Sequence, residues 1–156
     1  MSVSHVREYL TQFGAQDRIL EFDVSSATVA LAAQALSCEP GRIAKTLSFM
    51  VGDEPILIVF GGEARIHNQK FKQRFGVKAK MMSAEEIERF TGLHFGGVCP
   101  FGIPENVAIY LDESLKLFDP VYPAAGSESS AVRVSLAELE MFSRARGWVD
   151  VSKLAE

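Results

Sequence analysis

The stretch PILIVF, residues 55–60, restricts the possible folds of this chain more than any other segment. An unbroken apolar run of this length suits a strand that is buried on both faces, as at the centre of a sheet. Residues 43–51 before it alternate apolar and polar side chains over much of their length, and Gly52-Asp53-Glu54 joins the two segments. The sequence therefore predicts a β-hairpin in the middle of a sheet.

Helices and further strands are expected around this hairpin. Ser83 with Glu86, and Ser135 with Glu138, match the capping box that begins many helices. The mixture of hairpin and crossover spacings favours an α+β (mixed α/β) fold, with a central mixed β-sheet flanked by helices. The expected helices cover residues 3–13, a segment from Ser25 or Ser26 to 37, 65–75, 83–92 and 135–146, and the further strands cover 18–22, 79–82, 107–112, 117–122 and 132–136.

Size and composition indicate one domain, residues 1–156, since 156 residues that are 47% hydrophobic can build a single core. The net charge of -4 argues against a generally basic DNA-binding protein, so any nucleic-acid contact must be local. No secretory signal is visible, and the longest apolar stretch, residues 27–36, is too short for a bilayer. Cys38 and Cys99 form no CxxC motif. We therefore expect a cytoplasmic protein with neither DNA nor a membrane as partner.

Lys45 interrupts the apolar face of the first hairpin strand, where Ile43 and Leu47 are its neighbours on the same side. One interpretation is structural: the stem of the lysine lies on apolar neighbours and its ammonium reaches water. The other is functional. In a cleft at the end of the sheet, partial burial disfavours the charge unless oxygen atoms of a substrate satisfy it.

The loop FGGVCPFG, residues 95–102, is a second candidate site. Gly96 and Gly97 permit backbone conformations that are closed to other residues, and Pro100 fixes the chain after them. Backbone amides and carbonyls of this loop are therefore expected to come close to a ligand. A tight connection between a helix and a strand explains the same composition, and the loop matches neither GxGxxG nor a P-loop.

Cys99 lies five residues after His94, so a thiolate beside an imidazole is one possible nucleophile. We favour a small pocket wall instead, because no third residue is evident to orient the histidine. Zinc binding is disfavoured, because His5, His67 and His94 show none of the short paired spacings of zinc sites. The sequence predicts no metal and no cofactor.

Residues 65–80 contain only basic charges, among them Lys70, Lys72 and Arg74. A charge run of this kind is usually the solvated face of a helix. It also suits contact with a phosphate backbone, which gives salt-sensitive affinity with little sequence readout.

Three segments together resemble the YbaK/prolyl-tRNA editing-domain family, whose members are freestanding aminoacyl-tRNA deacylases. They are RIAKTLSF, TGLHFGGVCPFG and YLDESLKLFDPVYPAAGSESSAVRVSLAEL, which follow the order and spacing of the family from about residue 22 to 142. The resemblance is carried by a lysine-threonine pair at the start of a strand, Lys45-Thr46, and by a Gly-x-x-x-Pro loop, Gly96 to Pro100.

The resemblance implies metal-independent hydrolysis of the ester of a mischarged tRNA, typically tRNA(Pro), by an enzyme that acts in trans. It makes the mischarged aminoacyl-tRNA, and possibly an aminoacyl-tRNA synthetase, the expected partners. Lys45 would then be catalytic, and Lys70, Lys72 and Arg74 would contact the tRNA. The residues expected to bind the ester are Phe22, Thr46, Gly96, Gly97, Val98, Cys99, Pro100, Gly126 and Ser127.

The amino acid removed is left open by three positions. Phe22 and Arg133 stand where cysteine-removing members carry a tyrosine and an acidic residue, and Thr46 stands where alanine-removing members often carry asparagine. A non-catalytic module that binds aminoacyl-tRNA or a synthetase on the same fold is the alternative function.

Overall fold

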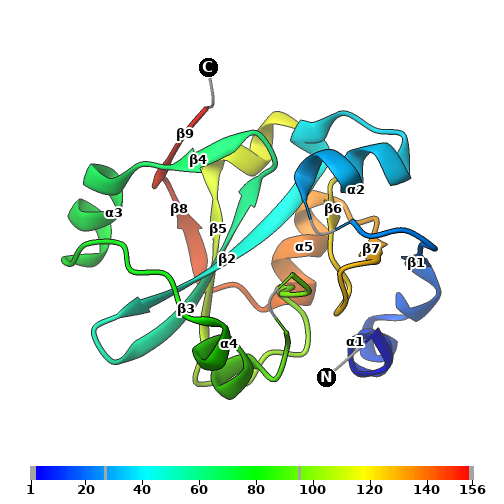
Figure 1. Cartoon of the computed structure of the whole chain (residues 1–156), viewed down its shortest axis with the longest axis horizontal. Coiled ribbons are helices and arrows are strands. Elements are labelled where there is room, and N and C mark those ends of the chain that lie inside the picture. Colours follow the sequence, from blue (N-terminus) through cyan, green and yellow to red (C-terminus); the bar gives the residue numbers. More distant parts are fainter. Residues whose placement is uncertain (1–2, 27, 95, 155–156) are drawn as a thin grey trace.

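The computed structural model describes residues 3–26, 28–94 and 96–154. Its centre is a five-stranded mixed sheet with the strand order β6-β2-β3-β5-β8 (Figure 1). β2 and β3 are antiparallel, and the other neighbouring pairs are parallel. The expected fold class is confirmed. The sheet strands are β2 (Ile43–Val51), β3 (Glu54–Gly61), β5 (Ala108–Asp112), β6 (Tyr122–Pro123) and β8 (Gly147–Val149), and two smaller pairs are formed by β1 (Ile19–Glu21) with β7 (Ser130–Val132) and by β4 (Ala64–Ile66) with β9 (Ser152–Leu154).

The predicted hairpin is confirmed. β2 and β3 pair from Val51 with Glu54 to Ala44 with Gly61. β3 is buried on both faces, as its apolar run predicts. Ile58 packs with Phe71 on one face, and Val59 belongs to a separate core cluster with Leu111 on the other.

Helices cover both faces of this sheet. α1 and α5 pack against the face that contains Val59, and α3 packs against the opposite face through Phe71. The two predicted capping boxes are present, because the side chains of Ser83 and Ser135 both accept a hydrogen bond from the backbone N–H at the third helical position. The helices are α1 (Val3–Leu10), α2 (Val29–Leu36), α3 (Asn68–Phe75), α4 (Ala84–Thr91) and α5 (Leu136–Ser143).

Several predicted boundaries are wrong. Thr28, rather than Ser25 or Ser26, caps α2, because its side chain accepts from the N–H of Leu31. The expected helix at 65–75 starts only at Asn68, since residues 64–66 form β4 with the C-terminal β9. Of the predicted strand 117–122, only its last residue is in a strand, and α5 ends three residues before the expected 146. β8 and β9 were not expected.

Two predicted segments begin at residues that lie outside the described part of the chain. The apolar stretch 27–36 begins at Ala27, and the loop 95–102 begins at Phe95; both of these residues lie outside the described ones. Among the helices that the structure describes, none combines the length and the apolar character needed to cross a bilayer.

The outer edge of β2 is paired at both ends and open between them. Ile43 and Ala44 pair with β6, whereas near the other end the N–H of Met50 donates to the carbonyl of Lys80 at 2.9 Å. The carbonyl of Ser48 likewise accepts from the N–H of Met82. Backbone groups of alternate residues point to the same side of a strand, so those of Thr46 face this edge as well. No described strand pairs with Thr46 there.

A substitution at Gly62 tests how tightly the turn between β3 and β4 packs against this end of β2. A Cβ atom at Gly62 would overlap the carbonyl oxygen of Pro40 and lie 3.1 Å from that of Ile43, whereas one at Gly147 would meet no heavy atom within 4 Å. We expect Gly62→Ala to lower the free energy of unfolding by about 3 kcal/mol, because backbone must move. Gly147→Ala should be nearly neutral. Equal effects in chemical denaturation would contradict this packing.

Candidate active site

A cavity of about 490 Å³ lies along the open edge of β2. Lys45, Thr46 and Ser48 line it from β2, and the other walls come from five separate parts of the chain. These are the start of α2, the segment before and within α4, the loop at 96–98, β6, and the turn at 126–130 with the start of β7. Residues of β2, α2, α4 and β6 thus all line the same cavity. Figure 1 shows how these four elements are arranged.

Lys45 is half-buried in the wall of this cavity. Its Nζ donates to the carbonyl oxygens of Gly62, at 3.3 Å, and Ala64, at 2.5 Å, in the turn between β3 and β4. Burial lowers the pKa of Lys45 below that of an ordinary lysine, and the nearby positive charge of Arg65 lowers it further. No described carboxylate forms an ion pair with it. Because an ammonium has three N–H donors, one remains for a ligand.

Thr46 adds unpaired polar groups next to Lys45. Its Oγ1 is buried and has no hydrogen-bond partner among the described residues. A buried hydroxyl without a partner costs free energy, so such groups usually serve a ligand or an ordered water. With the backbone N–H and C=O of the same residue at the open edge, Thr46 offers the cavity both donors and acceptors.

The loop that starts at Gly96 and the turn at 126–130 are packed backbone against backbone. A Cβ atom at Gly97 would lie 3.0 Å from Cα of Ser127, which explains the second glycine of the loop. Gly96 has φ +94° and Gly126 has φ +99°, a region that favours glycine. The two segments, about thirty residues apart in sequence, thus form one wall.

The structure brings some of the predicted residues to the cavity and places others behind it. Lys45, Thr46, Gly96 and Val98 line it. Gly97, Gly126 and Ser127 belong to the packed wall, and Phe22 pairs with the turn through its N–H, which donates to the carbonyl of Ser129 at 2.8 Å. Pro100 is buried and does not line the cavity.

Cys99 lies in the hydrophobic core, where none of its surface is exposed. Burial raises the pKa of its thiol to about 12, and the thiol donates to the carbonyl of Phe101 at 3.7 Å. A thiolate nucleophile needs a lowered pKa and access to substrate. Both conditions are missing at Cys99, so the alternative of a thiol hydrolase loses its support.

Sequence reasoning missed several residues of the cavity. Met81, Met82 and Ile87 supply an apolar wall, and Glu128 supplies a carboxylate. Ile87 gave no signal, because the core-facing side of a helix requires the same pattern, and Met81 and Met82 lie in the segment before α4. Glu128 directly follows Gly126 and Ser127, to which the family resemblance assigns a part in binding the ester.

A family model described as an aminoacyl-tRNA editing domain matches residues 24–142. This chain belongs to that family. The resemblance carried by Lys45-Thr46 and by Gly96 to Pro100 is thereby confirmed.

Individual proteins are similar to this chain over much of its length. The editing domain is 47% identical over 154 residues to the uncharacterized protein YwhH of Bacillus subtilis (strain 168), with 98% of each chain covered. It is 29% identical over 106 residues to EbsC of Enterococcus faecalis (strain ATCC 700802 / V583), named as a proposed Cys-tRNA(Pro)/Cys-tRNA(Cys) deacylase, with 66% of this chain and 64% of EbsC covered. The crystal structure of a proposed trans-editing enzyme for prolyl-tRNA synthetase superposes with a TM-score of 0.87 at 28% identity, covering 97% and 96% of the two chains.

The predicted tRNA-contacting residues lie on α3 and do not line the cavity of this editing domain. Two of them are engaged in the fold. Lys70 pairs with Asp150 at 3.0 Å, and the guanidinium of Arg74 lies 5.0 Å from the ring centre of Phe75. Lys72 is exposed and forms no ion pair with a described residue.

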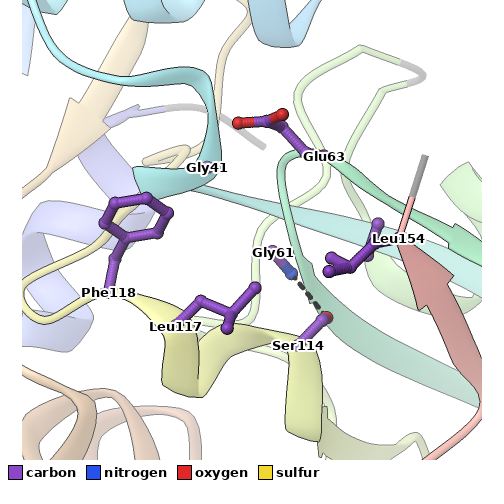
Figure 2. A pocket seen from close by; sticks show the side chains of 8 residues that line it. Gly41, Gly61, Glu63, Ser114, Leu117, Phe118 and Leu154 are labelled. Carbon is purple, nitrogen blue, oxygen red and sulfur yellow. Dashed lines mark hydrogen bonds between the residues drawn. The ribbon is translucent and has the colours of Figure 1, made fainter. Parts of the chain in front are cut away.

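A second cavity, of about 140 Å³, is drawn in Figure 2. Leu117, Phe118 and Leu154 give it an apolar lining, and the N–H of Gly61 donates to Oγ of Ser114, both of which also line it. Its volume is too small for an aminoacylated nucleotide, so we do not assign it a substrate.

Within residues 3–26, 28–94 and 96–154, no group of three His, Cys, Asp or Glu side chains is arranged to hold a metal ion.

The surroundings of Lys45 predict how its amine titrates. In NMR titrations that follow the lysine side chains, Lys45 should lose its proton at lower pH than the exposed lysines. Arg65→Gln should raise the pKa of Lys45 by removing a like charge, but not to the ordinary value, because burial is the larger cause. Arg74→Gln, a change on α3, should leave it unchanged. A Lys45 that titrates together with the exposed lysines would contradict this description of the site.

Proposed function

We propose that this editing domain is a trans-editing deacylase that hydrolyses the ester of a mischarged aminoacyl-tRNA, with tRNA(Pro) as the expected tRNA. The observation that carries the proposal is the half-buried Lys45 ammonium in the cavity wall, which is bound by two carbonyls and by no described carboxylate. Such a cation is a good partner for an oxygen atom that becomes negative during a reaction. The proposed relation to prolyl-tRNA synthetase rests on the relatives. The cytoplasm as its compartment remains the expectation drawn from the sequence.

The proposed reaction needs few protein groups, because an aminoacyl ester is already activated. The oxygen of a water molecule adds to the ester carbonyl, and the carbonyl oxygen becomes an oxyanion. We assign its stabilisation to Lys45 and to the open-edge N–H of Thr46. The ester C–O bond then breaks, and the proton lost by the water goes to the ribose oxygen that leaves. As the family resemblance implies, the neighbouring ribose hydroxyl helps to activate the water. Positioning and electrostatic stabilisation thus supply most of the catalysis.

We further propose that α3 contacts the phosphate backbone of the acceptor stem. Neither Lys72 nor Arg74 forms an ion pair with a described residue, and of the two only Arg74 lies over an aromatic ring. Lys70 and Arg74 would have to share their charge between the contacts described above and the phosphates. Affinity of this kind carries little sequence information, so the choice of tRNA would depend on other contacts.

A panel of mischarged tRNAs tests the proposed function. At least one should be deacylated faster than in buffer alone, and Lys45→Ala should lower kcat on that tRNA by about 10²–10³-fold, the usual effect of removing one oxyanion donor. The variant should still unfold cooperatively. Lys153→Ala, which removes an exposed lysine outside the cavity, should retain full activity.

Two outcomes would count against the proposal. If no tRNA is deacylated while one is bound, the domain is a binding module rather than an enzyme. If Lys45→Ala retains the rate of the wild type, another group is responsible for the catalysis.

A further inference from the structure

We propose that Glu128 binds the α-ammonium group of the aminoacyl ester, so that the site selects esters whose amino group is free. This inference rests on the proposed function, since it assigns another part of the same substrate to the same cavity. An aminoacyl ester carries a protonated amine next to a carbonyl that becomes negative in the reaction. A complementary site therefore needs one anion and one cation.

The cavity contains such a pair of charges. Among the described residues that line it, Lys45 and Glu128 are the ones that are charged at neutral pH. Lys45 projects from β2, and Glu128 from the turn between β6 and β7. The two residues form no ion pair with each other. Each charge is therefore available to a ligand placed between them.

The backbone of Glu128 is fixed by its neighbours. Its carbonyl accepts hydrogen bonds from both the N–H and the Oγ of Ser26, the latter at 2.9 Å. Within the turn, the Oγ of Ser130 accepts from the N–H groups of Ala125 and Ser127 and donates to the carbonyl of Ser127. The hydroxyls of Ser26 and Ser130 thus already form hydrogen bonds to the backbone of this turn. The carboxylate of Glu128 has no hydrogen bond or ion pair within the described part of the chain.

The side chain of Glu128 lies beside Gly96, in the loop that forms part of the cavity wall. A Cβ atom at Gly96 would lie 3.3 Å from its Oε2 and 3.8 Å from its Cβ. Glycine at position 96 thus leaves room for this carboxylate beside the loop, in addition to permitting the positive φ. The Glu128 carboxylate thus lies on the cavity wall, on a backbone held by hydrogen bonds, and no described cation pairs with it. These three observations support a cation of the ligand as its partner.

A pair of non-hydrolysable ligands tests this role in the full-length protein. The first is 3′-alanylamino-3′-deoxyadenosine, an amide analogue of the aminoacylated terminal adenosine, and the second is the same compound acetylated on the α-amine. We expect the wild type to bind the free amine about tenfold more tightly, the lower end of the range for hydrogen bonds to charged groups, because Glu128 is exposed. Glu128→Gln should reduce this preference to about threefold or less.

The matched control is Glu140→Gln, which removes an exposed carboxylate on α5 outside the cavity and should leave the preference intact. Equal binding of the two ligands by the wild type, binding of neither, or an undiminished preference in Glu128→Gln would each overturn the inference. Tighter binding of both ligands by Glu128→Gln would overturn it too, because the carboxylate would then repel the nucleotide.

The outcome is separable from that of the proposed function. Deacylation in the tRNA panel together with equal binding of the two ligands would reject only the role of Glu128. An amine preference that depends on Glu128, with no deacylation of any tRNA, would support the role of Glu128 and reject the deacylase.

Discussion

The gap in the outer edge of β2 is the feature on which the rest of the site depends. A central sheet needs hydrogen-bond partners for its backbone groups, and an unpaired edge usually carries a cost. Here β6 covers the start of the edge, and residues 80–82 cover its far part. Thr46 remains between them, and the segments that stop short of it form the walls of the cavity. The fold thus places the polar groups of Thr46 in a cavity whose lining is largely apolar.

This arrangement also explains why a lysine is tolerated on an apolar face of the hairpin. Lys45 lies between a cluster around Ile43 and α2 and another around Phe49 and α3, where neither cluster closes over it. Two carbonyls of the turn between β3 and β4 hold its ammonium at the cavity wall. The ammonium therefore lies in a cavity, as the functional interpretation expects, rather than in open solvent. Its role toward a substrate remains a prediction.

Features that depend on neighbouring residues could be predicted from the sequence. The hairpin, both capping boxes and the buried character of β3 follow from local patterns, and the structure confirms them. Lys45 stood out because it broke such a pattern. Features that depend on distant segments could not be predicted. β9 forms only because β4 offers it a partner, and Glu128 reaches the cavity because its turn packs on a loop about thirty residues earlier in the chain. The catalytic and binding roles of the site residues remain predictions.

Amide hydrogen exchange at Thr46 tests the central claim most directly. In the free protein, the account predicts that the amide of Thr46 exchanges faster than that of Met50, which is hydrogen-bonded to Lys80 on the same edge. A bound 3′-aminoacylamino adenosine that fills the gap should slow the exchange of Thr46 and leave that of Met50 unchanged. An amide of Thr46 as well protected as that of Met50 before any ligand is added would show that the edge is closed, and would contradict the account.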